Sequence, residues 1–262
     1  MQAFSLETSL IKPKDNIVNM LIQAVKRRNL KLEDKDVIAI SSKAVAMAQG
    51  RIVELHQVTP SKEARTLAEK HSLQPQFAEL IIQEAEQIYG GVEKAVLTLK
   101  NGILTVNAGI DRKNAPSGHV VLSPLHPQQH VENIRNEIRQ KAGKKVGVFV
   151  VDSDVAPLRM GTRGLAVAVT GFEPVKDCRD EKDLFQKPLL ITRHAIADDL
   201  ASLAHLLMGE TSEKTPFVLI RDAPVTFTDE KVSPEEMEIS SDKCVYASAF
   251  KISAANLETV NP

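Results

Sequence analysis

The segment LTLKNGILTV, residues 97–106, decides the fold class of this chain. Two apolar stretches flank Asn101-Gly102, a pair that tolerates the positive φ angles of a two-residue type I′ turn. The pattern predicts a β-hairpin, which requires antiparallel pairing. Since the other helical and strand-like segments follow one another without a regular βαβ period, we expect a mixed α/β (α+β) fold. An antiparallel sheet with flanking helices is favoured over a doubly wound sheet.

The segments on either side of this hairpin alternate between helical and strand patterns. Apolar residues at helical spacing predict helices over residues 16–28, 75–88, 128–141 and 195–208, and Pro60 opens another. Short apolar runs predict buried strands at 36–40, 146–151, 165–169 and 217–220. In the polar tail, Cys244-Val245-Tyr246 is expected to pair with a sheet edge.

Length and charge limit the function classes. The 262 residues are 43% hydrophobic, enough for one unit over residues 1–262, or for two intimately packed subdomains divided before Gln128 or around 177–188. The 33 basic and 34 acidic residues nearly cancel, so we expect no nucleic-acid partner. No run of 18 apolar residues occurs and charges interrupt the first twenty residues, which predicts a cytoplasmic protein without a membrane partner.

Two aspartates stand out as candidate metal ligands. Asp111 and Asp152 each follow an apolar run that would fix the backbone, and carboxylate oxygens suit Mg²⁺ or Mn²⁺. The alternative is that both are ordinary exposed turn acids. Neither a P-loop, a Gly-x-Ser-x-Gly elbow nor an H-E-x-x-H helix is present, so no catalytic nucleophile is assigned, and His194 and His205 are interpreted as helix residues.

The segment NAGIDRKN, residues 107–114, resembles the NAGID-x-x-N signature of the coenzyme F420-0 gamma-glutamyl ligases. Matching segments flank it in the same order. They include Ser42-Lys43, Gln49-Gly50-Arg51, Asp152-Ser153 and the LLMGE segment at 206–210, and together they cover residues 5 to 222. The resemblance implies a gamma-glutamyl ligase-like fold.

The resemblance also implies an activity. Such ligases use GTP to activate a carboxylate of the coenzyme precursor as an acyl phosphate, which the amine of L-glutamate then attacks to form an amide. Charge on the transferred phosphoryl group calls for metal ions and oriented donors rather than for a covalent nucleophile. Expected cofactors are Mg²⁺ or Mn²⁺ at two sites, with room for K⁺. Small-molecule substrates and a second copy in a homodimer are the expected partners.

By the same resemblance, Asp111 and Asp152 bind one divalent ion, while Ser153 and Glu210 serve a second. The nucleotide is expected to contact Ser9, Leu10, Ile11, Ser42, Lys43, Asn114, Met208, Gly209, Glu210, Thr211, Ser212, Glu213, Lys214 and Thr215.

The chain departs from the family pattern at several basic positions. Met47 replaces a lysine, Val155-Ala156 replaces a Gly-Arg pair, and Gln186-Lys187 stands where the family has Gly-Arg. A charge-assisted contact to phosphate is worth about 1.5–3 kcal/mol, so such losses weaken nucleotide binding. Two alternatives follow: a diverged ligase with another acceptor or nucleotide, and a catalytically silent ligand-binding protein of the same fold.

Overall fold

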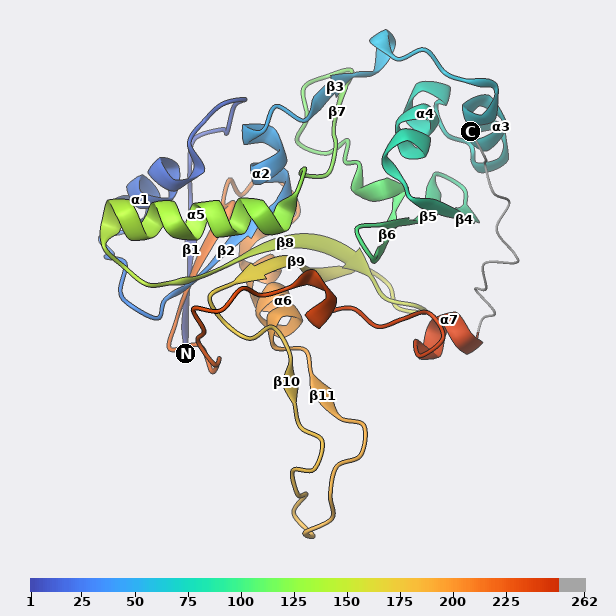
Figure 1. Cartoon of the computed structure of the whole chain (residues 1–262). Coiled ribbons are helices and arrows are strands. Elements are labelled where there is room, and N and C mark those ends of the chain that lie inside the picture. Colours follow the sequence, from blue (N-terminus) through green and yellow to red (C-terminus); the bar gives the residue numbers. More distant parts are fainter. Residues whose placement is uncertain (250–262) are drawn as a thin grey trace.

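A computed structural model describes residues 1–249 (Figure 1). Its centre is a five-stranded sheet in the order β1-β12-β2-β8-β9. The strands are β1 (Gln2–Leu6), β12 (Phe217–Arg221), β2 (Val37–Ser41), β8 (Gly147–Val155) and β9 (Thr162–Thr170). Within this sheet β2 and β8 run parallel, and the other neighbours are antiparallel. The fold is therefore mixed α/β, as the sequence predicts.

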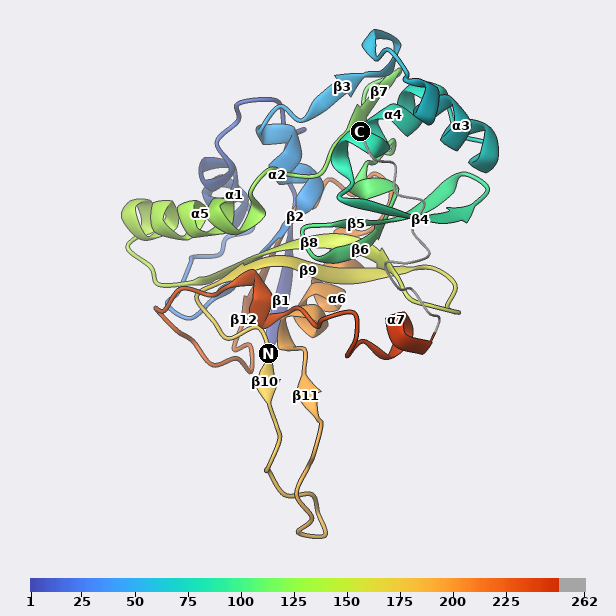
Figure 2. The same cartoon turned by 45° about the vertical axis from the view of Figure 1, so that its right-hand side comes forward.

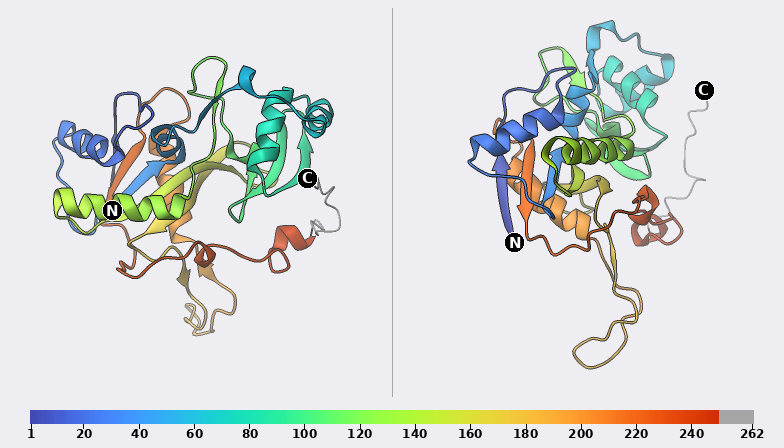
Figure 3. Two further views of the ribbon diagram at one scale, coloured as in Figure 1. Left: turned by 45° about the horizontal axis from the view of Figure 1, so that its top comes forward. Right: turned by 60° about the vertical axis from the view of Figure 1, so that its left-hand side comes forward.

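Helices cover both faces of the central sheet (Figures 1 and 3). Helices α1 (Ile17–Arg27) and α5 (Pro127–Ala142) bury Leu21 and Ile138 against one face, together with α2 (Ser42–Ala48). On the other face, α6 (Ile196–Met208) buries Leu200 and Ala204. The apolar runs of β2 and β8 are buried on both sides because each face meets a helix layer.

A second group of elements packs at one end of the central sheet (Figure 2). It contains helices α3 (Lys62–His71) and α4 (Pro75–Glu84), the sheet β4 (Gln87–Val92), β5 (Ala95–Lys100) and β6 (Ile103–Val106), and the pair β3 (Ile52–Glu54) and β7 (His119–Val121). Short 3-10 turns are η1 (Leu55–Gln57) and η2 (Asn107–Gly109). Asn101 and Gly102 have φ angles of 48° and 72°, which confirms the predicted hairpin.

Three local predictions are wrong. His194 is not a helix residue, because it pairs with Lys176 in the short strand β11 (Arg193–His194). Helix α4 ends at Glu84 rather than at Ile88, because residues from Gln87 onward pair with β5 instead. Residues around Cys244 form no strand, and the helix α7 (Val245–Ala249) begins directly after it. The strand predicted over 146–151 also continues further, since β8 includes Asp152 and Asp154. Pairing with another strand decides the end of α4 and the length of β8.

A long hairpin projects from the body of the molecule below α6 (Figure 2). Its short strands are β10 (Lys176–Asp177) and β11 (Arg193–His194), and four exposed apolar side chains lie beyond them. These are Leu184, Phe185, Leu190 and Ile191, with 76–96% of their surface accessible. The tail with η3 (Pro234–Glu236) and α7 continues below the sheet. Within residues 1–249 no helix combines the length and apolar character needed to cross a membrane.

Candidate active site

The carboxyl ends of β2 and β8 bring the first site residues together. The parallel register pairs Ser41 with Val151, so Ser42 at the start of α2 and Asp152 on β8 emerge side by side. Ser42 is one of the groups that act on the ionisation of Asp152. Polar side chains at this edge of a parallel pair are well placed to meet a ligand.

Asp111 reaches this edge through the NAG turn. Asn107, Ala108 and Gly109 all adopt left-handed φ angles, from 53° to 68°, and the Asn107 Oδ1 accepts a hydrogen bond from the Val96 N–H at 2.9 Å. The backbone of Asp111 then pairs with Val121 through two hydrogen bonds of 2.9 Å. This turn fixes the carboxylate, which forms an ion pair with Lys43.

Glu210 lies directly after α6 at the centre of a hydrogen-bond network. Its Oε1 accepts hydrogen bonds from the Thr162 hydroxyl at 2.6 Å and the Ser153 hydroxyl at 3.1 Å. The same oxygen lies 2.8 Å from Nε2 of His205, and Oε2 pairs with the Lys113 ammonium at 2.9 Å. The structure thus joins Ser153 and Glu210, which are 57 residues apart in sequence.

The loop after α6 is tied to two other segments. Asn114 donates from Nδ2 to the Thr211 carbonyl at 2.7 Å, and the Thr8 N–H donates to the Lys214 carbonyl at 2.9 Å. The Thr215 hydroxyl folds back to the Met208 carbonyl at 2.7 Å. Residues expected to contact the nucleotide in 208–215 and at Asn114 therefore share one loop cluster.

The remaining residues expected to contact the nucleotide lie in the connection from β1 to α1 and in the 208–215 loop. Ser9 and Leu10 are exposed in the connection from β1 to α1, whereas Ile11 packs in part against the core below α1. Thr8, next to Ser9, provides the hydrogen bond from this connection to the 208–215 loop. In that loop Gly209 leaves space that the Glu213 side chain occupies, while Ser212 is exposed.

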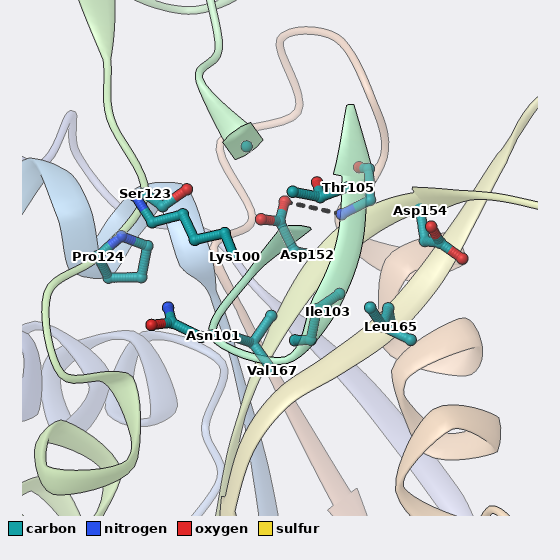
Figure 4. Close-up of a pocket in the computed structure, with 12 residues that line it drawn as sticks. Lys100, Asn101, Ile103, Thr105, Ser123, Pro124, Asp152, Asp154, Leu165 and Val167 are labelled. Atoms are coloured by element: carbon teal, nitrogen blue, oxygen red, sulfur yellow. Dashed lines mark hydrogen bonds between the residues drawn. The ribbon is translucent and has the colours of Figure 1, made fainter. Parts of the chain in front are cut away.

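A small hollow adjoins Asp152 on the side of the β5–β6 hairpin (Figure 4). Lys100 and Asn101 line it from the hairpin, and Asp154 and Leu165 line it from the central sheet. Its volume of about 30 Å³ has room for roughly one water molecule. The hairpin that decides the fold class therefore forms one wall beside the acidic site.

The pKa values of Asp152 and Glu210 are shifted in opposite directions. Burial raises the pKa of Asp152 to about 6, since the hydrogen bonds from Ser153 and Ser42 only partly offset it, while the negative charge of Asp111 adds to the rise and Lys43 opposes it. Burial also opposes ionisation of Glu210. The hydrogen bonds to Glu210 from Thr162, Lys113, His205 and Ser153 outweigh that effect and lower its pKa to about 2.

The raised pKa of Asp152 predicts a pH-dependent stability. Between about pH 4 and 6 the folded protein binds more protons at this group than the unfolded chain, whose carboxyl titrates near 3.9, so the free energy of unfolding falls as the pH rises. In metal-free protein, the free energy of unfolding of the Asp152→Asn variant is expected to decrease with rising pH by about 1–3 kcal/mol less than that of wild type. Unfolding midpoints in EDTA at pH 5 and pH 7 measure it. An identical pH dependence in variant and wild type would contradict the assignment.

The donor set of the site fits hard divalent cations. Two carboxylates, Asp111 and Asp152, act on one another electrostatically, and the Ser153 hydroxyl contacts Glu210. In residues 1–249 no three His, Cys, Asp or Glu side chains gather into a complete cluster. One or two protein carboxylates are enough for a Mg²⁺ ion whose other ligands are substrate phosphates and waters.

Three contacts at Glu210 come from residues to which no site role was assigned. Lys113 lies within the NAGIDRKN segment, Thr162 begins β9, and His205 stands on the last turns of α6. The spacing of His205 and Glu210, five residues across a helix end, was the one available signal. The contacts of Lys113 and Thr162 depend on pairings between distant segments.

Comparison with known proteins gives the family. The family model described as F420-0:Gamma-glutamyl ligase matches residues 5–222, which include the end of β1 and all other strands of the central sheet. The chain belongs to the F420-0:gamma-glutamyl ligase family. Its sequence is 37% identical over 213 residues to the coenzyme F420:L-glutamate ligase of Methanocaldococcus jannaschii, covering 79% of this chain and 85% of that protein.

Two further relatives carry the same name. The Methanopyrus kandleri protein is 34% identical over 212 residues, which are 80% of this chain and 82% of the relative. The Methanococcus maripaludis protein is 38% identical over 199 residues, with 76% and 80% covered. The match to the gamma-glutamyl ligase family model thus covers every residue of the candidate site and the central sheet apart from the start of β1.

The positions where this chain departs from the gamma-glutamyl ligase pattern differ in location and in solvent exposure. Met47 is half-buried in α2, whereas Val155 ends β8 with 45% of its surface exposed. In the following loop Leu158 and Met160 are almost fully exposed. Gln186 lies in the projecting β10–β11 hairpin. Lys43 and Lys113 supply positive charge beside the acids of the site.

Proposed function

We propose that this protein is a GTP- and divalent-metal-dependent amide ligase that adds L-glutamate to the carboxylate of coenzyme F420-0 or of a related acceptor. Membership of the family and the names of its relatives support the glutamate ligation. The observation that carries the metal and nucleotide parts is the meeting of Asp111, Asp152, Ser153 and Glu210 at one edge of the sheet.

The proposed reaction has two steps. An acceptor carboxylate oxygen attacks the γ-phosphorus of GTP, which releases GDP and forms an acyl phosphate. The glutamate amine then attacks the acyl carbon, the C–N bond forms, and inorganic phosphate leaves with loss of the amine proton. Neither step needs a covalent side-chain nucleophile, which agrees with the absence of a recognisable one in this sequence.

The residues of the site have separate parts in this proposal. Asp111 and Asp152 would hold one Mg²⁺ or Mn²⁺ ion, and Ser153 and Glu210 a second. Divalent ions at such sites neutralise the charge of phosphate oxygens. Lys43 now pairs with Asp111, and it would be free to contact phosphate once a metal ion takes over that carboxylate.

In this proposal the nucleotide binds at the loop cluster formed by residues 208–215 and Asn114. The hydrogen bond from Asn114 to the Thr211 carbonyl ties this loop to the segment after Asp111, and the link from Thr8 to Lys214 brings the segment of Ser9 to Ile11 to its edge. Cytoplasmic GTP and glutamate would supply the substrates.

A second candidate function rests on the β8–β9 loop. The exposed Leu158 and Met160 give this loop an apolar surface close to the site, and Val155-Ala156 carries no charge. This favours a diverged ligase of the same mechanism with a less charged acceptor. A catalytically silent ligand-binding protein would have no use for the Glu210 network.

Thermal unfolding with manganese, GTP and ATP tests the nucleotide site. A ligand at about one hundred times its dissociation constant adds about 2.7 kcal/mol of stability, which raises the midpoint by about 2–4 °C per kcal/mol. We expect a rise that requires Mn²⁺ and GTP together, and formation of an F420-0 product heavier by one glutamyl residue in mass spectra. Absence of a rise with either nucleotide would favour the silent protein, and a rise without F420-0 turnover would favour another acceptor.

The projecting β10–β11 hairpin supports a homodimer. Leu184, Phe185 and Ile191 expose more than 80% of their surface on a segment that leaves the body of the protein, and exposed apolar patches of this kind mark association sites. We propose that a second copy covers them.

Phe185→Lys tests the dimer. The variant is expected to shift the dimer–monomer midpoint in sedimentation velocity by about tenfold or more in concentration, since a 1.4 kcal/mol loss is tenfold. Leu158→Lys, at another exposed apolar position, is the matched control. A monomeric wild type, or equal association of variant and wild type, would disprove the role of the hairpin.

A further inference from the structure

Lys113 connects two acids of the candidate active site. Its ammonium pairs with Oε2 of Glu210 at 2.9 Å, and the carboxylate of Asp111 also attracts it. The main chain of Lys113 takes part as well. Its N–H donates to Oδ1 of Asp111 at 2.6 Å, and its carbonyl accepts a hydrogen bond from the Lys43 ammonium at 3.0 Å. The backbone of Lys113 is therefore fixed beside Asp111, and its side chain reaches from there to Glu210.

The two carboxylate oxygens of Glu210 have different kinds of partner. The hydroxyls of Thr162 and Ser153 donate to Oε1, and the ring of His205, whose side chain is only 14% exposed, lies against the same oxygen. Lys113, the partner of Oε2, has a side chain that is 62% exposed. An exposed ion pair adds little stability, and the ammonium of a lysine is carried by a flexible four-carbon stem. The contact between Lys113 and Glu210 is therefore easily broken.

A divalent ion bound to Glu210 would displace this ammonium. An ion held by either carboxylate oxygen would lie within a few ångströms of Nζ of Lys113, and like charges at such a separation repel one another. The loop cluster proposed to hold the nucleotide begins at the next residue, because Asn114 donates to the Thr211 carbonyl. A released Lys113 side chain would thus start from the edge of the nucleotide site.

From these contacts we propose that Lys113 is a counter-ion that changes its partner. It neutralises Glu210 in the free protein, and it contacts a phosphate group of the nucleotide once a divalent ion is bound. This inference rests on the metal- and nucleotide-dependent ligation proposed above. Lys113 then opposes metal binding in the absence of nucleotide and favours nucleotide binding in the presence of metal, so it strengthens the coupling between the two ligands.

Binding of Mn²⁺ and of GTP to Lys113→Met tests this role. Methionine removes the ammonium, while the main-chain contacts with Asp111 and Lys43 remain possible. Without nucleotide, the variant is expected to bind Mn²⁺ about two- to fivefold more tightly than wild type, the effect of losing an exposed ion pair. Electron paramagnetic resonance of free Mn²⁺ measures this affinity. At saturating Mn²⁺, the Kd of GTP from isothermal titration calorimetry is expected to rise about tenfold, because a charge-assisted contact is lost.

Arg112→Met is the matched control. It removes the same charge from the neighbouring residue, whose guanidinium lies 4.3 Å from the centroid of the Phe77 ring and donates to Oε1 of Gln74 at 3.1 Å. This control is expected to bind Mn²⁺ and GTP like wild type, and Lys113→Arg, which keeps the charge, is expected to restore GTP binding.

The outcomes separate this inference from the ligase proposal. Unchanged or weaker binding of Mn²⁺ alone by Lys113→Met, an unchanged Kd of GTP in that variant, or equal changes in Arg112→Met would each overturn the role of Lys113 and leave the ligase proposal standing. A wild-type protein that binds no Mn²⁺ would overturn both.

Discussion

Replacement of Asp111 by asparagine is expected to lower the rate of glutamate addition by about 10²- to 10³-fold, the size of effect seen when one charge-stabilising group is removed from an active site. The side chain keeps its size but loses the negative charge that now pairs with Lys43. A divalent ion and the phosphates it would neutralise then lose a ligand. Initial rates with F420-0, GTP and glutamate measure the effect, and the Mn²⁺-dependent rise in unfolding midpoint with GTP should also disappear.

Asp222→Asn is the matched control for this variant. Asp222 is exposed and follows the far end of β12, whereas the start of that strand lies beside Ser41. Its φ angle of 53° suits asparagine as well as aspartate. Its rate should equal that of wild type. An Asp111→Asn variant with wild-type turnover and an unchanged response to manganese and GTP would refute the metal assignment.

Gly164→Ala is expected to destabilise the protein by about 1–3 kcal/mol, the usual cost of an extra methyl group in a packed interior. An added Cβ at this position of β9 would lie 2.1 Å from the Ala201 carbonyl oxygen of α6. The backbone of a helix cannot yield as a flexible side chain would. The unfolding midpoint should fall by about 2–4 °C per kcal/mol.

The same substitution should also affect the site. Gly164 is paired with Ser153 on β8, and α6 ends just before Glu210, so displacement of α6 moves Glu210 away from the Ser153 hydroxyl. Ser202→Ala is the control, because it removes the hydrogen bond from Ser202 to the Gly164 carbonyl without adding an atom. The control should lose no more than about 1 kcal/mol. Equal midpoints for Gly164→Ala and wild type would show that α6 tolerates the methyl group.

Features that depend only on residues close together in the sequence could be predicted well. The Asn101-Gly102 turn needs only its own backbone preferences, and α1 begins at the cap Asn16 and ends in Lys26-Arg27, both visible in the sequence. The apolar run before Asp152 predicts a buried strand because few other structures bury such a run. The types of these elements, helix or strand, therefore agree with the prediction.

Features set by distant pairing could not be predicted. The bulge between Val150 and Val151 and the continuation of β8 through Asp154 depend on β9 as a partner. The residues around Glu210 come from four separate elements, and nothing in the spacing of Lys113 or Thr162 points to it. The resemblance to the ligase family assigned Ser153 and Glu210 to one metal ion, whereas residue patterns alone did not link them.

The strand order has a consequence for synthesis of the chain. Strand β12 lies between β1 and β2, so the first strand waits for a partner about 215 residues later in sequence. At about 5–20 residues per second, a ribosome needs roughly 10–40 s to cover that distance. During this time β1 and one edge of β2 lack their neighbour, and such open edges invite association with other chains. A nascent chain of this kind benefits from a chaperone that covers apolar strands until β12 emerges.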